Sequence, residues 1–128
     1  MKKILIVISL ITVLLTISSC SSITTPNLVI SKLFDATSSK DNVIEIYNAS
    51  ENEVDLEDVE IRIYNNGSTT KGGDHSIELT GLLGSKEYYV VSGNNTQNQD
   101  IKDKTDFEFN GNLPFNGNDV IELYFKNI

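Results

Sequence analysis

The sequence predicts an all-β fold, an antiparallel β-sandwich of about seven strands that follows a cleaved N-terminal segment. Three observations predict it. From residue 28 onward, short runs are rich in β-branched and aromatic residues, which favour strands. Several runs alternate apolar with polar residues, as a strand buried on one face requires. Clusters of Asn, Gly and Asp separate the runs and are typical of turns.

Residues 1–19 have the pattern of a lipoprotein signal peptide. Lys2 and Lys3 form a basic start, and residues 4–17 are apolar except for three hydroxyl side chains. At 1.5 Å per residue this run spans roughly 21 Å, short of the roughly 30 Å hydrocarbon core of a bilayer. The run ends in Ile17-Ser18-Ser19-Cys20, which resembles the lipobox of bacterial lipoproteins. We therefore expect cleavage before Cys20 and acylation of that residue, whose thiol then has no redox or catalytic role.

Two other interpretations of this segment stay open. In one, a simple secretory signal is cut near Ser19 and leaves Cys20 as a free thiol; in the other, the segment is an uncleaved anchor. Acylation also accounts for a single unpaired cysteine in an exported chain. We expect a protein on the extracytoplasmic face of a bacterial cell membrane, held by the acyl chains on Cys20. Residues 20–27 are then the lipidated Cys and a short tether, and residues 28–128 the folded domain.

The part that folds is acidic. The chain has eighteen Asp and Glu against ten Lys and Arg, a formal charge of -8, and removal of residues 1–19 takes away two lysines and leaves -10. A surface of this sign repels phosphate backbones, so we expect no direct binding of nucleic acid. One Cys and one His exclude a disulfide framework and a zinc site built from several Cys or His. We expect no cofactor.

Each predicted strand is a short run with its own pattern. The runs are residues 28–34, 43–48, 59–64, 76–79, 88–92, 107–109 and 120–125. In residues 59–64 the Val and Ile side chains share one face, whereas Glu60, Arg62 and Tyr64 share the other. Ile44 and Ile46 alternate with polar residues in the same way. Residues 51–58 are long enough for no more than a helical turn.

Turn formers separate these runs. The clusters are Asn65-Asn66-Gly67, Gly72-Gly73-Asp74, Gly93-Asn94-Asn95, Asn110-Gly111-Asn112 and Asn116-Gly117-Asn118-Asp119. Seven short strands joined by such turns, in about 100 residues, are typical of a β-sandwich.

Six segments follow one another in an order that is itself informative. They are Leu28-Val29-Ile30-Ser31, Val43-Ile44-Glu45-Ile46-Tyr47-Asn48, Val54-Asp55-Leu56 before residues 59–64, Ile77-Glu78-Leu79, Leu82-Leu83-Gly84 before Tyr88-Tyr89-Val90-Val91, and Asn116-Gly117-Asn118-Asp119-Val120-Ile121-Glu122-Leu123. This order resembles the lamin-tail domain family, found in nuclear lamins and in many exported bacterial proteins. The resemblance implies an immunoglobulin-like β-sandwich over nearly all of residues 28–125.

Two features depart from the family pattern. Lys32 stands where bacterial members often carry Glu, so an interaction made by that acid is absent or inverted here. Members also usually add one strand after the one that corresponds to residues 120–125. We therefore expect either a trimmed domain or a neighbour that covers this edge, which is a place for strand addition or oligomerisation.

The resemblance implies structural uses for Glu45, Asn48, Gly117 and Asp119. Asn48 closes its strand by bonding nearby backbone, and Glu45 faces outward or caps a loop. Asn116, Asn118 and Asp119 offer oxygen ligands of the kind that Ca²⁺ prefers, but one carboxylate brings little charge and an Asn-Gly turn explains the same residues. The acids Glu51, Glu53, Asp55, Glu57 and Asp58 are typical of a solvated face rather than a cation site.

His75 is the only histidine and hence the only side chain whose ordinary pKa suits a base near neutrality. No Gly-x-Ser-x-Gly nucleophile motif accompanies it, and its position after Gly72-Gly73-Asp74 indicates the start of a hairpin. We therefore expect no catalytic residue.

Three functions remain in order of preference. The first is a non-catalytic, membrane-anchored surface lipoprotein whose sandwich is a binding or structural module for a protein or glycan. The second is an accessory domain of an exported hydrolase, a nuclease or phosphatase, because lamin-tail domains are often joined to such enzymes; the chain is then part of a larger assembly or a truncated piece. The third is a hydrolase that uses His75 and acids.

Overall fold

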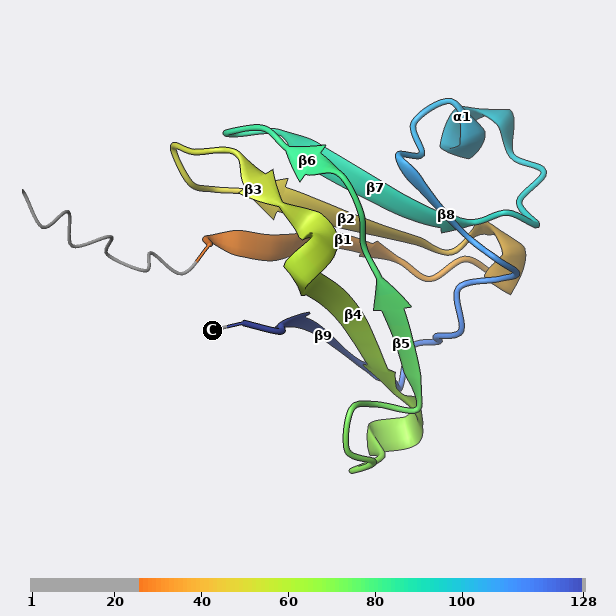
Figure 1. Ribbon diagram of the computed structural model, residues 1–128. Helices are drawn as coiled ribbons and strands as arrows, with labels where there is room; N and C mark the ends of the chain where they lie inside the picture. Colours follow the sequence, from red (N-terminus) through yellow and green to blue (C-terminus); the bar gives the residue numbers. More distant parts are fainter. Residues whose placement is uncertain (1–25, 128) are drawn as a thin grey trace, which may run out of the picture.

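Strands form at all seven predicted runs. The computed structural model describes residues 26–127 (Figure 1). The strands are β1 (Leu28–Phe34), β2 (Val43–Asn48), β4 (Val59–Tyr64), β5 (His75–Glu78), β7 (Tyr88–Gly93), β8 (Phe107–Phe109) and β9 (Val120–Phe125). Only β5, which begins and ends one residue early, and β7, which extends one residue further, differ from the predicted bounds. The all-β class is confirmed.

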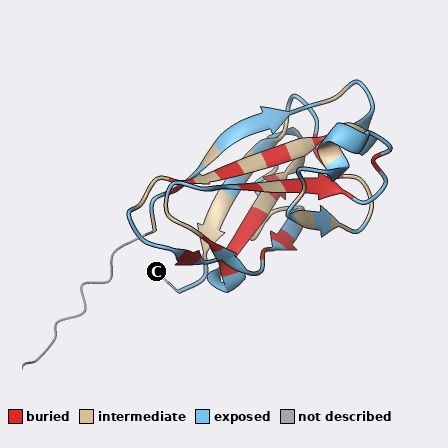
Figure 2. Cartoon of the chain, turned by 90° about the horizontal axis from the view of Figure 1, so that it is seen from above, coloured by how far each residue is buried: buried red, intermediate tan, exposed pale blue. Residues whose placement is uncertain are grey.

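The strands form two sheets that face each other. One has the order β1-β2-β7-β8 and the other the order β5-β4-β9. In the first, Ile46 of β2 lies opposite Ile30 and Tyr89; in the second, Ile61 of β4 lies opposite Ile77 and Leu123. Along β2, buried positions alternate with partly buried ones, whereas β4 begins with three buried residues before the same alternation (Figure 2). The predicted alternation therefore places the apolar face of each sheet against the other.

The core lies between the sheets and is closed by side chains from loops. Its buried apolar members are Leu28, Ile44, Ile46, Val54, Leu56, Val59, Ile61, Ile63, Ile77, Leu79, Leu83, Tyr89, Val91, Leu113 and Phe115. Burying one Ile or Leu side chain contributes about 1.5–3 kcal/mol. Because Leu113 and Phe115 belong to the loop before β9, packing fixes that loop onto the end of the sandwich.

Short elements outside the seven predicted strands complete the fold. β3 (Val54–Asp55) and β6 (Leu82–Leu83) form a two-stranded ladder. Three 3₁₀ turns are η1 (Ser39–Asp41), η2 (Leu56–Asp58) and η3 (Asn65–Gly67), and the one α-helix in the described part of the chain is α1 (Gln99–Lys102). The helical turn expected within residues 51–58 is η2, whose Leu56 is fully buried.

One strand pair differs from the antiparallel expectation. β7 and β8 run parallel, with Val91 opposite Phe107 and Gly93 opposite Phe109. The intervening residues 94–106 contain α1, and a crossover of this length is what a parallel pair requires. The chain thus leaves the end of β7, passes through α1 and turns back, so that β8 runs beside β7 in the same direction.

The two ends of β2 define the two ends of the molecule. Asn42 precedes β2 and Asn48 is its last residue; both side chains are fully buried.

Within residues 26–127, no helix is long and apolar enough to cross a membrane. Cys20 and the expected signal peptide lie outside the described residues.

Candidate binding cleft

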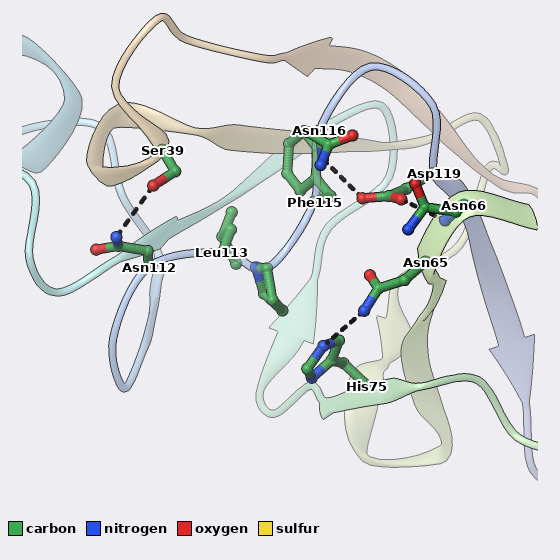
Figure 3. A pocket seen from close by; sticks show the side chains of 10 residues that line it. Ser39, Asn65, Asn66, His75, Asn112, Leu113, Phe115, Asn116 and Asp119 are labelled. Carbon is green, nitrogen blue, oxygen red and sulfur yellow. Dashed lines mark hydrogen bonds between the residues drawn. The ribbon is translucent and has the colours of Figure 1, made fainter. Parts of the chain in front are cut away.

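A polar cleft of about 420 Å³ lies at the Asn42 end of the sandwich (Figure 3). It is formed by η1, by η3, by the first residue of β5 and by residues 112–119. Its lining residues are Ser39, Asn65, Asn66, His75, Asn112, Leu113, Pro114, Phe115, Asn116 and Asp119. We call it the asparagine-rich cleft, because four of its residues are Asn. Segments distant in the sequence therefore meet at one site.

Asp74 fixes the wall that η3 forms. One of its carboxylate oxygens accepts a hydrogen bond from the backbone N–H of Asn65 at 2.8 Å, and the other accepts from the hydroxyls of Ser68 and Thr70. The bond from Asn65 is the main reason that the pKa of Asp74 lies below its ordinary value. Asn66 has a φ of 52°, in the left-handed region that Asn tolerates better than most residues. The charged carboxylate thus stabilises a strained turn.

Asp119 ties the opposite wall to η3. Its Oδ1 accepts from the backbone N–H of Asn66 at 2.7 Å, and its Oδ2 accepts from the backbone N–H of Asn116 at 2.8 Å. The Nδ2 of Asn118 donates to Oδ1 of Asn66 at 2.6 Å. Behind the loop, the buried amide of Asn42 donates to the carbonyl of Phe115 at 2.7 Å. These bonds hold both walls of the cleft in one arrangement.

His75 lies in this cleft beside an amide and not beside a nucleophile. Its Nε2 lies 3.2 Å from the Nδ2 of Asn65, which donates (Figure 3). The hydroxyl of Ser39 instead accepts from Nδ2 of Asn112 at 3.1 Å. Among the described residues no hydrogen bond joins His75 to a serine or a carboxylate, so the structure shows no serine–histidine pair of the kind that nucleophilic catalysis needs.

Several polar atoms of the cleft have no hydrogen-bond partner among residues 26–127. They are Oδ1 of Asn65, Nδ2 of Asn66, Nδ1 of His75 and Nδ2 of Asn116. Pro114 and Phe115 add an apolar part to the lining. Among the described residues, no Lys or Arg lines the cleft, and both oxygens of its one acid, Asp119, already accept hydrogen bonds. The chemistry therefore suits a neutral ligand with amide or hydroxyl groups.

The predicted calcium candidates do come together, but with other partners. Asn116 and Asn118 flank the loop that Asp119 closes, and Oδ1 of Asn116 accepts from the backbone N–H of Asn118 at 3.3 Å. In the described part of the chain, no three Asp, Glu, His or Cys side chains converge as metal ligands would. Gly117 lies in this loop and is not among the glycines with positive φ; a Cβ added to it would lie 3.3 Å from the Asp35 carboxylate.

The acids of residues 51–58 are dispersed among separate contacts. Glu51 pairs with Lys86 at 2.8 Å, Asp55 accepts from the backbone N–H of Glu57, and Asp58 accepts from Asn127.

Glu45 and Asn48 lie away from the cleft. Glu45 is on the outer face of the β1-β2-β7-β8 sheet, where it accepts from the Ser31 hydroxyl at 2.9 Å and pairs with Lys32 at 3.3 Å. Asn48, at the opposite end from the cleft, donates from Nδ2 to the carbonyls of Asn52, Leu83 and Gly84. Its Oδ1 accepts from the backbone N–H and the hydroxyl of Ser50. Asn48 thereby joins the end of β2 to β6.

Sequence reasoning missed most of the cleft. The clusters that contain Asn65, Asn66 and Asn112 predict turns and do not indicate a binding site. Asn is an ordinary turn residue, so no local signal in the sequence joins these separate turns into one site.

Comparison with protein families gives one finding. The model of the Lamin Tail Domain family matches residues 21–127, which include every strand of the sandwich. No curated protein was found to match the chain.

Proposed function

The chain belongs to the lamin tail domain family, and from that premise we propose that it is a non-catalytic, lipid-anchored module that binds its partner at the asparagine-rich cleft. The family is one of immunoglobulin-like, non-catalytic β-sandwich modules, which is consistent with a structural or binding role. Because a sandwich fold hosts many functions, the argument for binding depends on the site.

The observation that carries the proposal is the set of unpartnered polar atoms in the cleft. The amides of Asn65 and Asn66 are each held by one hydrogen bond, to His75 and from Asn118, and each presents its other polar atom to a ligand without further reorganisation. Asn65 lies in the β4–β5 connection and His75 begins β5, whereas Asn116 lies in the loop before β9. A ligand that contacts both walls therefore makes hydrogen bonds with two segments that are distant in the sequence. We infer a protein loop or a neutral glycan as the partner.

Membrane attachment through Cys20 agrees with the direction in which the cleft faces. Leu28 begins β1 opposite Asn48, so the chain enters the sandwich at the end remote from the cleft (Figure 1). β1 has seven residues, which at about 3.3 Å each span roughly 23 Å. A tether at Cys20 then leaves the cleft directed away from the lipid surface, where a partner can reach it.

Replacing the anchor residue tests the attachment. We expect the full chain to fractionate with membranes, and Cys20→Ala to appear in the soluble exported fraction, because no acyl chain remains to hold it. Ser19→Ala, which keeps a small residue before Cys20, is the matched control and is expected to stay with membranes. Unchanged membrane retention of Cys20→Ala refutes acylation as the cause of attachment.

The absence of catalysis is tested by turnover. We expect the purified chain lacking residues 1–20 to leave nucleic acid and phosphate esters intact. Hydrolysis that disappears in His75→Ala, while the fold persists by circular dichroism, contradicts the binding-module proposal and favours a hydrolase.

A differential capture experiment tests the cleft as a binding site. The chain from residue 21 serves as bait beside the double variant Asn65→Ala/Asn116→Ala and the control Asn52→Ala, whose exposed amide lies at the opposite end. We expect a partner from the cell surface to be retained by the unmodified chain and by the control, and to be lost by the double variant. Equal retention by all three contradicts the cleft as the site. Capture of a nuclease or phosphatase identifies the chain as the accessory domain of an exported hydrolase.

A further inference from the structure

β9 is an edge strand with outward-directed backbone groups. The carbonyls of Val59 and Ile63 on β4 accept from Leu79 and Asp74, on the β5 side. In an antiparallel pair, opposite residues direct their backbone groups either toward each other or both away. Val59 and Ile63 lie opposite Phe125 and Ile121, so the N–H and C=O of these two β9 residues point away from β4.

Leu123 lies two residues from both Ile121 and Phe125, so its backbone N–H and C=O also point away from β4. The backbone N–H of Lys126 donates to the carbonyl of Asp58, as the pattern requires for the intervening positions. Within residues 26–127, no backbone hydrogen bond satisfies the outer edge formed by Ile121, Leu123 and Phe125.

The other sheet edges are protected in ways that β9 is not. β1 has an irregularity between Ile30 and Lys32 and carries that charged residue on its edge. β8 has three residues and β5 has four. β9 has six residues in unbroken register, with no Pro, Lys or bulge. Bulges, edge lysines and short length are common means of blocking strand addition, and the one charged residue of β9 is Glu122, so β9 is the edge most open to it.

The inward side chains of β9 are apolar and only partly covered. Ile121, Leu123 and Phe125 pack against the core without being fully buried, and Val120 beside them is 53% exposed. We propose that a second copy of this chain adds its own β9 antiparallel to this edge, with Leu123 opposite the Leu123 of that copy. The two β5-β4-β9 sheets then form one continuous sheet. This inference rests on the edge alone and not on the proposed ligand of the cleft.

Complementarity along the strand selects this partner and this register. With Leu123 at the centre of the pairing, Ile121 of one copy lies opposite Phe125 of the other on the inner face. Ile121, Leu123 and Phe125, whose backbone groups point away from β4, then exchange backbone hydrogen bonds between the two copies. On the outer face Val120 lies opposite Lys126, which places Lys126 diagonal to Glu122 of the other copy. A register centred on Glu122 instead places the Glu122 carboxylates of the two copies opposite each other, and like charges in that position are destabilising. A centre at Tyr124 sets the inward Ile121 against the polar Asn127.

Cysteine cross-linking tests both the partner and the register. Single Cys variants at Leu123, Glu122 and Tyr124 are made in the full chain carrying Cys20→Ala, so that no other thiol is present. Opposite residues that exchange backbone hydrogen bonds have Cα atoms about 5.5 Å apart, which a disulfide can bridge. We expect a disulfide-linked homodimer for Leu123→Cys under mild oxidation, and at least severalfold less for Glu122→Cys and Tyr124→Cys. Equal or greater cross-linking of either control overturns the register, and cross-linking only to a different protein overturns self-association.

A surface variant keeps the test independent of folding. Glu122 is exposed, and Glu122→Lys sets its new charge diagonal to Lys126 of the other copy. By sedimentation equilibrium of the Cys20→Ala chain we expect this variant to dimerise roughly fivefold more weakly than the parent, with unchanged circular dichroism. A parent chain that stays monomeric at every concentration, or a variant that dimerises equally well, overturns the proposal.

Discussion

The side chain of Asn48 shows how one buried amide can fix two segments. It bonds the carbonyls of Leu83 and Gly84 and the backbone N–H of Ser50 from a fully buried position. Alanine leaves these groups without partners, so we expect Asn48→Ala to lower the free energy of unfolding by about 3 kcal/mol. Urea denaturation measures the loss. Asn52→Ala keeps the carbonyl that Asn48 contacts and is expected to change stability by less than about 0.5 kcal/mol. Similar losses for both variants contradict this role.

Glu60 makes part of the stability dependent on pH. Burial raises the pKa of its carboxyl, but hydrogen bonds from Ser76 and Arg62 and the charge of Arg62 outweigh that effect and hold the pKa below its ordinary value. A lowered folded pKa means that the stabilisation is present above the unfolded pKa, near 4.5, and is lost as pH falls below it. We expect Glu60→Gln to show a smaller fall in urea midpoint between pH 7 and pH 3 than the parent. The same fall in both proteins contradicts the contribution of Glu60.

At the residue scale, sequence reasoning predicts local chemistry better than it predicts assembly. Asn116 and Asp119 share one turn, so their proximity follows from spacing. Asn65 and Asn112 are far apart in the sequence and meet only because the β4–β5 connection and the loop before β9 end at the same side of the sandwich. No local pattern encodes that meeting.

At the element scale, the strands with a clear period of two are those that the sequence predicts. β2 and β4 alternate over six residues each, which is enough to identify both faces. β3 and β6 have two residues each and carry no periodicity, so only their pairing with each other identifies them. The direction of β8 has no local signal either, because it depends on the path of the chain through α1.

Close approach of the backbone at the β7–β8 end gives an element-scale prediction. A Cβ on Gly93 would lie 2.3 Å from the carbonyl oxygen of Gly111, a backbone atom that cannot turn aside. We expect Gly93→Ala to destabilise the protein by about 2–3 kcal/mol, as overpacking does. Gly117→Ala is the control, because its Cβ would meet only the flexible Asp35 carboxylate at 3.3 Å. Thermal unfolding compares the two, and equal midpoints contradict the steric argument.

At the scale of the whole molecule, the proposed functions lie at different places on the sandwich. The chain enters at the end that Asn48 closes, and the asparagine-rich cleft lies at the other. The free edge of β9 runs between the two ends. The proposed anchoring, ligand binding and self-association therefore fall on separate parts of the surface, so all three are compatible in one molecule.

The central claim is that the asparagine-rich cleft binds the partner of this module. Its most direct test is the dissociation constant of the captured partner for the parent chain, for Asn65→Ala/Asn116→Ala and for Asn52→Ala. Each lost hydrogen bond costs about 1 kcal/mol, so we predict roughly tenfold to thirtyfold weaker binding by the double variant. The same affinity as the parent is predicted for Asn52→Ala. A double variant that keeps its fold and binds as tightly as the parent contradicts the claim.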